Sequence, residues 1–291
     1  MKKTFSLVIL CFLGAVQAYS QSDKKPDKIT VNDLITRHLA SIGDKDSLAA
    51  ASTRVMTGQG TLTQKVGSGV SGFVLAGPAQ FASSNRSVVY VISFDNNTYP
   101  YEKLAFDGSN VSFGLPSGKS TLLVNYLRTQ NAILKDGLLG GTLSAAWPLL
   151  DIRSGQKTKL EMAGTTTING KSCYKVKYSS GRTGDMKVAL YFDADTFRHV
   201  RTEYLYTIEP SIGTSSTDTQ STSRVERYQL VEDFSDFTAA GKLTLPMTYK
   251  ITITSEGQIK NSTGTNVREW LMNFDKVFYD QRLGPEAFKV S

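Results

Sequence analysis

The side chains of this sequence that could do chemistry are mostly carboxylates at strand ends. Asp193 and Asp195 could offer two carboxylates to a metal ion, but no further ligand follows at the spacing of a calcium loop. Acidic residues also begin tight turns, because their side chains accept hydrogen bonds from nearby backbone N–H groups. Asp233 and Asp236 stand near the end of another strand pattern and favour the same interpretation. We therefore expect turns at both places and no metal site.

Motifs for nucleophilic catalysis and nucleotide binding are absent from the sequence. His38 and His199 have no cysteine or histidine at metal-ligand spacing, so we expect them at a solvent edge or in packing. No Gly-x-Ser-x-Gly motif of serine hydrolases occurs. Residues Gly114 to Ser120 (GLPSGKS) lie where a phosphate-binding loop would lie, but three residues instead of four separate the glycines. That spacing favours a plain turn and helix cap. The sequence thus predicts a protein that is not an enzyme and uses no cofactor.

The first 18 residues are predicted to be an export signal. Lys2 and Lys3 precede an apolar run from Phe5 to Val16, and residues 16 to 18 (VQA) place small residues where signal peptidase cleaves. The apolar run is about half of what crosses a bilayer, which disfavours a membrane anchor. We expect cleavage after Ala18, a periplasmic or otherwise exported protein, and no transmembrane segment in the mature chain.

The cysteines and the charge limit the partners of the mature chain. Cys11 lies inside the apolar run, so a lipid-anchored product cleaved there is an alternative with an unusually short hydrophobic region. After cleavage at Ala18, Cys173 is the only cysteine, and we expect a buried thiol without a disulfide. Removing Lys2 and Lys3 lowers the formal net charge from +7 to +5. The remaining basic residues are scattered, which allows a weak attraction to anionic lipid headgroups and predicts no nucleic-acid binding.

The segment from residue 120 to 151 is the one long helix pattern in a strand-rich chain. After Gly137 it is apolar almost all round, yet it is too short to span a membrane and is interrupted by Gly140 and Pro148. A sheet must shelter such a segment, so we predict that it forms a helical lid over a curved sheet, with an apolar space between them.

The rest of the mature chain is predicted to be a polar leader, residues 19 to 28, followed by a single domain, residues 29 to 291. Helix patterns cover Ile29 to Ile42 and roughly Asp46 to Ala51, and strand patterns begin at Thr53. Asn169-Gly170 is the strongest hairpin signal. About ten antiparallel strands with one dry face must curl around something, which predicts a mainly β fold closed by the lid.

Six stretches, in order along the chain, carry a resemblance to a known family: LITRHLASIG, TRVMTGQG, GLLGGTLSAAWPLLD, YFDADTFRHVRTEY, FSDFTAAGKLTLPMTYKI and FDKVFYDQRLGPEAFKV. Together they resemble the periplasmic lipoprotein carriers and outer-membrane lipoprotein receptors, the LolA/LolB-like superfamily, and especially its uncharacterised exported members. The resemblance implies an unclosed antiparallel barrel of about eleven strands covered by helices, whose cavity holds the acyl chains of a lipoprotein. The chain looks like the soluble carrier kind, although it is considerably longer, and the arginine and lid contacts typical of the family match no particular residue.

We therefore expect a non-enzymatic, exported binder or carrier of a lipid or of a lipoprotein acyl chain. The dry faces of the strands and the apolar face of the lid supply the predicted cavity lining: Leu123, Leu127, Leu139, Trp147, Val188, Leu190, Phe192, Met247, Tyr249, Ile251, Ile253, Trp270, Met272 and Phe274. The same residues could instead pack against each other and fill the core.

Two other functions remain open at this point. The first is an envelope interaction or sensor module with a filled core, which docks a protein partner through a sheet edge or through the polar loop from Ser211 to Ser223. The second is an enzyme acting on envelope polymers, which rests only on scattered carboxylates such as Asp193 and Asp233.

Overall fold

The computed structural model describes residues 29–66, 70–116, 121–150, 158–208, 226–259 and 262–290. Its strands are β1 (Thr53–Val66), β2 (Val70–Ser84), β3 (Ser87–Ser93), β4 (Tyr101–Phe106), β5 (Val111–Gly114), β6 (Thr158–Ile168), β7 (Lys171–Ser180), β8 (Lys187–Asp193), β9 (His199–Ile208), β10 (Glu226–Ala240), β11 (Leu243–Ile259) and β12 (Ser262–Tyr279). Its helices are α1 (Val31–Ile42), α2 (Lys45–Ala50), α3 (Leu122–Thr129) and α4 (Ala132–Lys135), with 3-10 turns η1 (Gly141–Leu143), η2 (Pro148–Leu150) and η3 (Pro285–Phe288).

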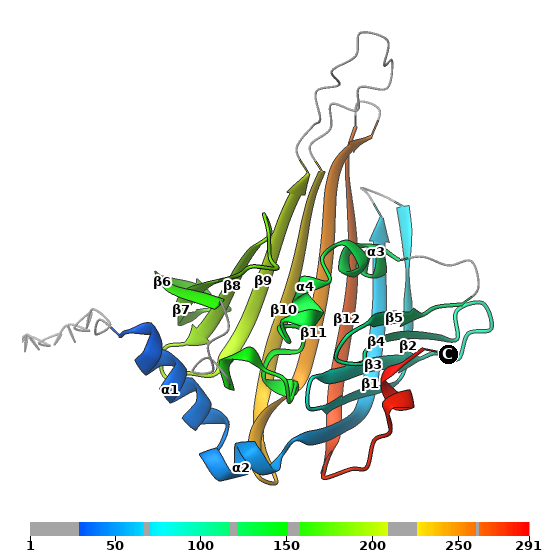
Figure 1. The fold of residues 1–291 in the computed structure, drawn as a ribbon. Coiled ribbons are helices and arrows are strands. Elements are labelled where there is room, and N and C mark those ends of the chain that lie inside the picture. Colours follow the sequence, from blue (N-terminus) through cyan, green and yellow to red (C-terminus); the bar gives the residue numbers. More distant parts are fainter. Residues whose placement is uncertain are drawn as a thin grey trace, which may run out of the picture.

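The strands form one antiparallel sheet that does not close (Figure 1). Its order is β5-β4-β3-β2-β1-β12-β11-β10-β9-β8-β7-β6, so β5 and β6 are the two free edges. The predicted mainly β, unclosed architecture is confirmed, with twelve strands in the described chain instead of about eleven. The middle of the sheet joins opposite ends of the chain, because β1 pairs with β12 from Arg54 opposite Tyr279 to Val66 opposite Asn266.

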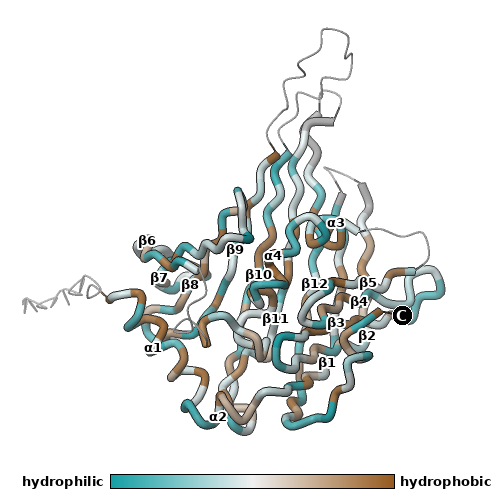
Figure 2. The backbone as a smooth tube through the Cα atoms, viewed as in Figure 1, coloured by the Kyte–Doolittle hydropathy of each residue, from teal (hydrophilic) through white to brown (hydrophobic). Residues whose placement is uncertain are grey.

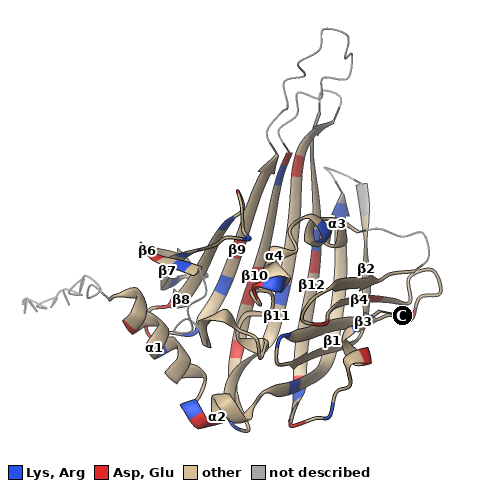
Figure 3. Cartoon of the chain, in the orientation of Figure 1, with Lys and Arg blue, Asp and Glu red and all other residues tan. Residues whose placement is uncertain are grey.

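Alternation of apolar and polar residues gives the sheet one dry face. Hydrophobic and hydrophilic residues alternate along the long strands (Figure 2), so one face of each strand is dry. The dry faces of both halves of the sheet meet the lid in one core cluster. Charged side chains are spread over the strands and helices rather than gathered on one element (Figure 3), as the scattered basic residues predict.

Two predicted strand boundaries are wrong. The strand patterns at Ser71 to Leu75 and Gln80 to Ser84 predict two separate strands, but the structure has one continuous strand, β2, because Gly77 and Pro78 stay extended opposite β1. The polar residues from Asn261 to Thr265 predict a turn, but β12 already begins at Ser262. The Asn169-Gly170 hairpin is confirmed; both residues have positive φ, as a type I′ turn requires.

The N-terminal helices form largely as predicted. Thr30 caps α1 by accepting a hydrogen bond from the Asp33 backbone N–H, and Gly43 ends the helix. Leu34, Ile35 and Ile42 lie on the buried face of α1 and pack into the core. This places α1 at one end of the lid.

The lid, residues 121 to 150, is the largest departure from the predicted elements. It contains an eight-residue helix, a four-residue helix and two 3-10 turns instead of one long helix. Gly137 and Gly140 have φ of +70° and +85°, a conformation that ends the helical path each time. The segment lies across the concave face of the sheet (Figure 1). Its apolar side chains are buried there, although its helices are short.

The C-terminal segment covers part of the opposite, convex face. Phe288 in η3 packs into a small second cluster with Val55, Ala82, Val89 and Ala105. Lys103 Nζ donates to the Lys289 carbonyl at 2.8 Å, which ties the segment to β4. The convex faces of β1 to β4 are therefore shielded by the chain's own end.

Candidate binding site beneath the lid

The structure brings the predicted lining residues together under the lid. Thirteen of the fourteen are buried in the main core cluster, and Met247 is partly buried and packs against it. They come from α3, from the segment after α4, and from β8, β11 and β12. The predicted lining residues therefore belong to one continuous apolar core, which includes the side chains of the lid.

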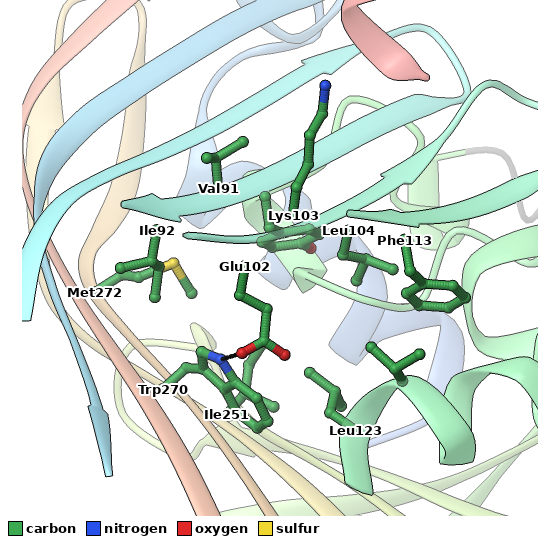
Figure 4. Close-up of a pocket in the computed structure, with 12 residues that line it drawn as sticks. Val91, Ile92, Glu102, Lys103, Leu104, Phe113, Leu123, Ile251, Trp270 and Met272 are labelled. Atoms are coloured by element: carbon green, nitrogen blue, oxygen red, sulfur yellow. Dashed lines mark hydrogen bonds between the residues drawn. The ribbon is translucent and has the colours of Figure 1, made fainter. Parts of the chain in front are cut away.

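A small void borders the lid and the sheet among the described residues. A void of about 30 Å³ lies between α3 and the strands β3, β4, β11 and β12, bordered by Leu123, Ile251, Trp270 and Met272 (Figure 4). This is room for about two water molecules, so the void is too small for an acyl chain while the lid lies on the sheet.

A larger groove lies outside, between α1, α2 and η2. Its volume is about 980 Å³, comparable to the upper range of small-molecule sites. Apolar side chains on its walls include Ile35, Leu39, Leu48, Leu149 and Leu150. The groove borders the end of the lid, so an apolar molecule in it would contact Leu149 and Leu150.

Polar contacts fasten the lid at separate points along its length, and the first is Glu102 on β4. Its Oε1 accepts from the Thr121 hydroxyl at 3.2 Å, and Thr121 in turn caps α3. Its Oε2 accepts from Arg268 at 2.8 Å. The same oxygen accepts from the Trp270 indole N–H at 3.2 Å (Figure 4). Glu102 and Arg268 are both buried, so this ion pair links β4 and β12 across the concave face at the start of the lid.

The second fastening point is Asp136, the residue after α4. Its carboxylate accepts hydrogen bonds from the Ser180 hydroxyl at 2.5 Å and the Tyr178 hydroxyl at 3.2 Å. Arg182 pairs with its other oxygen at 2.8 Å. These contacts bind the end of α4 to β7 and to the turn after it.

The third point is Glu232, a fully buried carboxylate on β10. It accepts from the Gly140 backbone N–H at 2.6 Å, from the Tyr204 hydroxyl at 2.6 Å and from the Tyr249 hydroxyl. Burial without a paired cation raises the pKa of Glu232 to about 7, against the opposing effect of these hydrogen bonds. The carboxylate therefore holds the middle of the lid and changes charge near neutral pH.

The fourth point is Arg54 on β1, which is almost completely buried. One terminal nitrogen donates to the carbonyls of Thr142 at 2.7 Å and Leu143 at 3.2 Å, and Nε donates to Ala51 at 3.2 Å. Arg54 thereby satisfies carbonyls at η1 that the short helical turn leaves without partners.

The fifth point joins the lid to α1 through His38. The Trp147 indole N–H donates to His38 Nε2 at 3.1 Å, so Nδ1 carries the proton and donates to the Phe197 carbonyl at 2.9 Å. Burial lowers the pKa of His38 to about 4, and burial also lowers the pKa of the neighbouring His199. Both histidines are fully buried, so the packing role is confirmed and the solvent-edge alternative is wrong.

The other sequence hypotheses have mixed outcomes. Asp193 does begin a turn, since its carboxylate accepts from the backbone of Asp195 and Thr196. The turn expected at Asp233 and Asp236 is wrong, because both residues lie within β10, which continues to Ala240. Cys173 is a buried free thiol. Within the described chain, no group of three or more His, Cys, Asp or Glu could hold a metal ion, and no helix there could cross a membrane. The export signal, residues 117 to 120 of the phosphate-loop-like stretch, and the polar loop from Ser211 to Ser223 lie outside the described residues.

Sequence reasoning missed the polar residues that hold the lid. Three of these charged residues face the core from their strands, on the same side as apolar residues two positions away: Glu102, Glu232 and Arg268. A charged residue that interrupts the dry face of an alternating pattern was the signal available. Arg54 stands two residues before the buried Met56 in the same way.

Comparisons with known proteins find similarity in structure only. No family model matches the chain, and no curated protein does. Solved structures that it resembles include a DUF1329 family protein from Desulfovibrio piger, with 12% identity, 89% of this chain and 97% of that chain covered, and a TM-score of 0.45. A LolA superfamily protein from Nitrosomonas europaea shows 12% identity, coverage of 90% and 98%, and a TM-score of 0.43. A putative outer membrane lipoprotein-sorting protein domain from Vibrio parahaemolyticus shows 9% identity, coverage of 87% and 95%, and a TM-score of 0.43.

Two of these structural neighbours are described as a LolA superfamily protein and as an outer membrane lipoprotein-sorting protein domain. At these identities and TM-scores, the likeness concerns the path of the chain and assigns no ligand to it.

Proposed function

We propose that this protein is an exported, non-enzymatic binder or carrier of a lipid or of a lipoprotein acyl chain, and that the lid leaves the concave face to admit that chain. The observation that supports this most directly is the cover of the concave face. One segment, residues 121 to 150, fills the apolar space with its own side chains and is attached by a few discrete polar contacts.

The construction of the lid suits a part that moves. Isolated helices shorter than about 12 residues are marginal in water, so α3 and α4 depend on the sheet for their order. A segment of this kind can open with less loss of internal hydrogen bonds than a long helix would suffer. The lid can therefore leave the sheet without unfolding the strands beneath it.

The exposed face would bind an acyl chain by burial alone. Each methylene removed from water contributes about 0.8 kcal/mol, so a long chain on the dry face gains enough to compete with the lid's own leucines. The groove beside α1 and η2 offers an apolar first contact of suitable size at the end of the lid. Lid opening and chain binding would then be alternative ways to cover the same surface.

A disulfide staple between the lid and the sheet tests this function. The Ala145 backbone N–H donates to Ser83 Oγ at 2.8 Å, which brings the two residues close enough for engineered cysteines. We expect Ser83→Cys/Ala145→Cys, in a Cys173→Ser background, to lose binding of an apolar fluorescent dye when oxidised and to regain it when reduced. The single Ser83→Cys variant is the matched control and should bind the dye under both conditions. Equal dye binding by the oxidised and reduced double variant would contradict the proposal.

A second function, an envelope interaction module with a filled core, is favoured by the small interior void. Its docking surface would be the edge strand β6, where Thr165, Thr166 and Thr167 are exposed and one side of the backbone pairs with no other strand in the described chain. A photo-crosslinking residue at Thr166 should then capture a protein from the native envelope, and the oxidised staple should leave that capture unchanged.

A further inference from the structure

Four polar side chains converge on one point of the lid, in surroundings that are otherwise apolar. Glu232 comes from β10, Tyr204 from β9, Tyr249 from β11 and Tyr90 from β3. All four are buried in the middle of the concave face, at Gly140 of the lid. A buried carboxylate is costly to desolvate, and an apolar side chain at position 232 would pack against the leucines of the lid equally well.

One member of the cluster is poorly partnered. The hydroxyl of Tyr90 is buried next to the hydroxyl of Tyr249, and no hydrogen bond of ordinary geometry reaches it. It lies directly against Gly140, since a Cβ added at Gly140 would be 2.2 Å from that oxygen. A buried hydroxyl without a well-formed hydrogen bond costs free energy, so its presence calls for a group that it contacts in another state.

The carboxylate of Glu232 also has no paired cation among the described residues. The groups that face Glu232 are the three tyrosine hydroxyls, the Gly140 N–H and, on the opposite side of β10, the carboxylate of Asp233. No cation contacts Glu232 in the described structure. Asp233 instead pairs with Arg201 at 2.7 Å and Lys250 at 3.5 Å on the convex side.

On these grounds, which rest on the proposed lid opening, we infer that Glu232, Tyr90, Tyr204 and Tyr249 form a recognition site for a protonated amine at the polar end of the bound amphiphile. In the closed state the Gly140 N–H supplies one of the hydrogen bonds that this amine would make. When the lid leaves, a carboxylate and three hydroxyls remain on an apolar floor. An ammonium donates up to three hydrogen bonds and neutralises the carboxylate, and the rings of Tyr90 and Tyr249, 5.9 Å apart, can contact its charge.

The site is tested with three ligands of equal chain length and different head groups. Decylamine, decanol and decanoate compete at pH 8 against a neutral apolar dye bound to the wild-type protein. We expect decylamine to displace the dye at a concentration at least tenfold lower than decanol, and decanoate to be the weakest. Three equal affinities, or a preference for decanoate, would overturn the inference.

Two variants assign the preference to the cluster. Glu232→Gln keeps the shape and removes the charge, so the ratio of its affinities for decylamine and decanol should lose the preference for the amine. Asp233→Asn makes the same chemical change on the opposite face of the same strand and should keep the preference. Equal effects of the two substitutions would show that general charge, and not the cluster, sets the preference.

A pH series on the wild-type protein gives a check that does not depend on the folding of a variant. Between pH 5.5 and pH 8 the amine stays protonated while Glu232 ionises, so the affinity for decylamine relative to decanol should rise by about tenfold. A ratio independent of pH would contradict the inference. A wild-type protein that binds no dye at all would overturn the proposed function and this inference together, whereas dye binding without amine preference would overturn this inference alone.

Discussion

The guanidinium of Arg54 donates a hydrogen bond of 2.7 Å to the carbonyl of Thr142, and so joins the first strand of the sheet to the lid that covers it. The two residues are 88 positions apart in the sequence. The carbonyl belongs to η1, where the chain crosses the middle of the concave face. The hydrogen bonds of Arg54 therefore hold the second half of the lid against the sheet.

We predict that Arg54→Met opens the lid more easily than it unfolds the sheet. Hydrogen bonds from a charged donor are each worth about 1.5–3 kcal/mol, so the loss of those to Thr142 and Leu143 should destabilise the lid by about 3 kcal/mol. Hydrogen exchange should become faster at residues 141 to 147, with little change in the strands. Arg54→Lys is the matched control and should recover only part of the protection, because one ammonium cannot reproduce the forked geometry. Uniform acceleration over the whole chain would contradict a local role.

Stability should fall as the pH rises through neutrality, because of Glu232. The pKa of Glu232 is raised from 4.5 to about 7, so the folded protein holds the proton more tightly than the unfolded chain does. The stabilisation is complete below about pH 4.5 and is lost as the pH rises through about 7, a change of ~3 kcal/mol. Urea denaturation at pH values from 5.5 to 8.5 should show this decline, and Glu232→Gln should abolish it.

His38 should oppose this trend on the acid side. Its pKa is lowered from 6.5 to about 4, so its contribution to stability is present above pH 6.5 and is lost as the pH falls through about 4. Urea denaturation of Glu232→Gln should still show stability falling as the pH drops from 6.5 toward 4, which separates the contribution of His38 from that of Glu232. If this acid-side loss of stability disappears in that variant, the assignment to His38 is wrong.

Leu139→Ala distinguishes a movable lid from a permanent core. Leu139 is buried in the lid, and its truncation should cost about 2–5 kcal/mol of stability in the closed state. If the lid competes with the ligand for the sheet, this loss makes dye binding tighter. Ile251→Ala on the sheet removes the same kind of contact from the surface that the dye would use, so its dye binding should become weaker. Weaker binding in both variants would favour a filled core.

The buried pair of Glu102 and Arg268 should show strong coupling. Arg268→Met leaves the Glu102 carboxylate buried without its cation, which should destabilise the protein by about 3–5 kcal/mol. Glu102→Gln/Arg268→Met should be markedly more stable than the sum of the single changes, because no charge is then left unpaired. Additive single effects in chemical denaturation would show that the pair contributes no specific interaction.

Much of the fold could be predicted from local patterns, because strand alternation and turn residues act over short distances. The alternation from Met247 to Ile253 and the Asn169-Gly170 turn both specify their structures locally. The breaks within the lid were harder to predict, since glycine reaches the left-handed conformation of Gly137 and Gly140 at little cost but does not have to adopt it, and the pattern alone does not say where the helical path ends. The polar contacts of the lid join residues far apart in the sequence, such as Glu232 and Gly140, and no local pattern pairs them.

The pairing of β1 with β12 at the middle of the sheet also determines when the protein can fold. Thr53–Val66 lies at the start of the described strands and Ser262–Tyr279 at their end, so the central hydrogen bonds cannot form until almost the whole chain is available. Contacts between such distant segments must first overcome the entropy of closing a long loop, and they make folding slow.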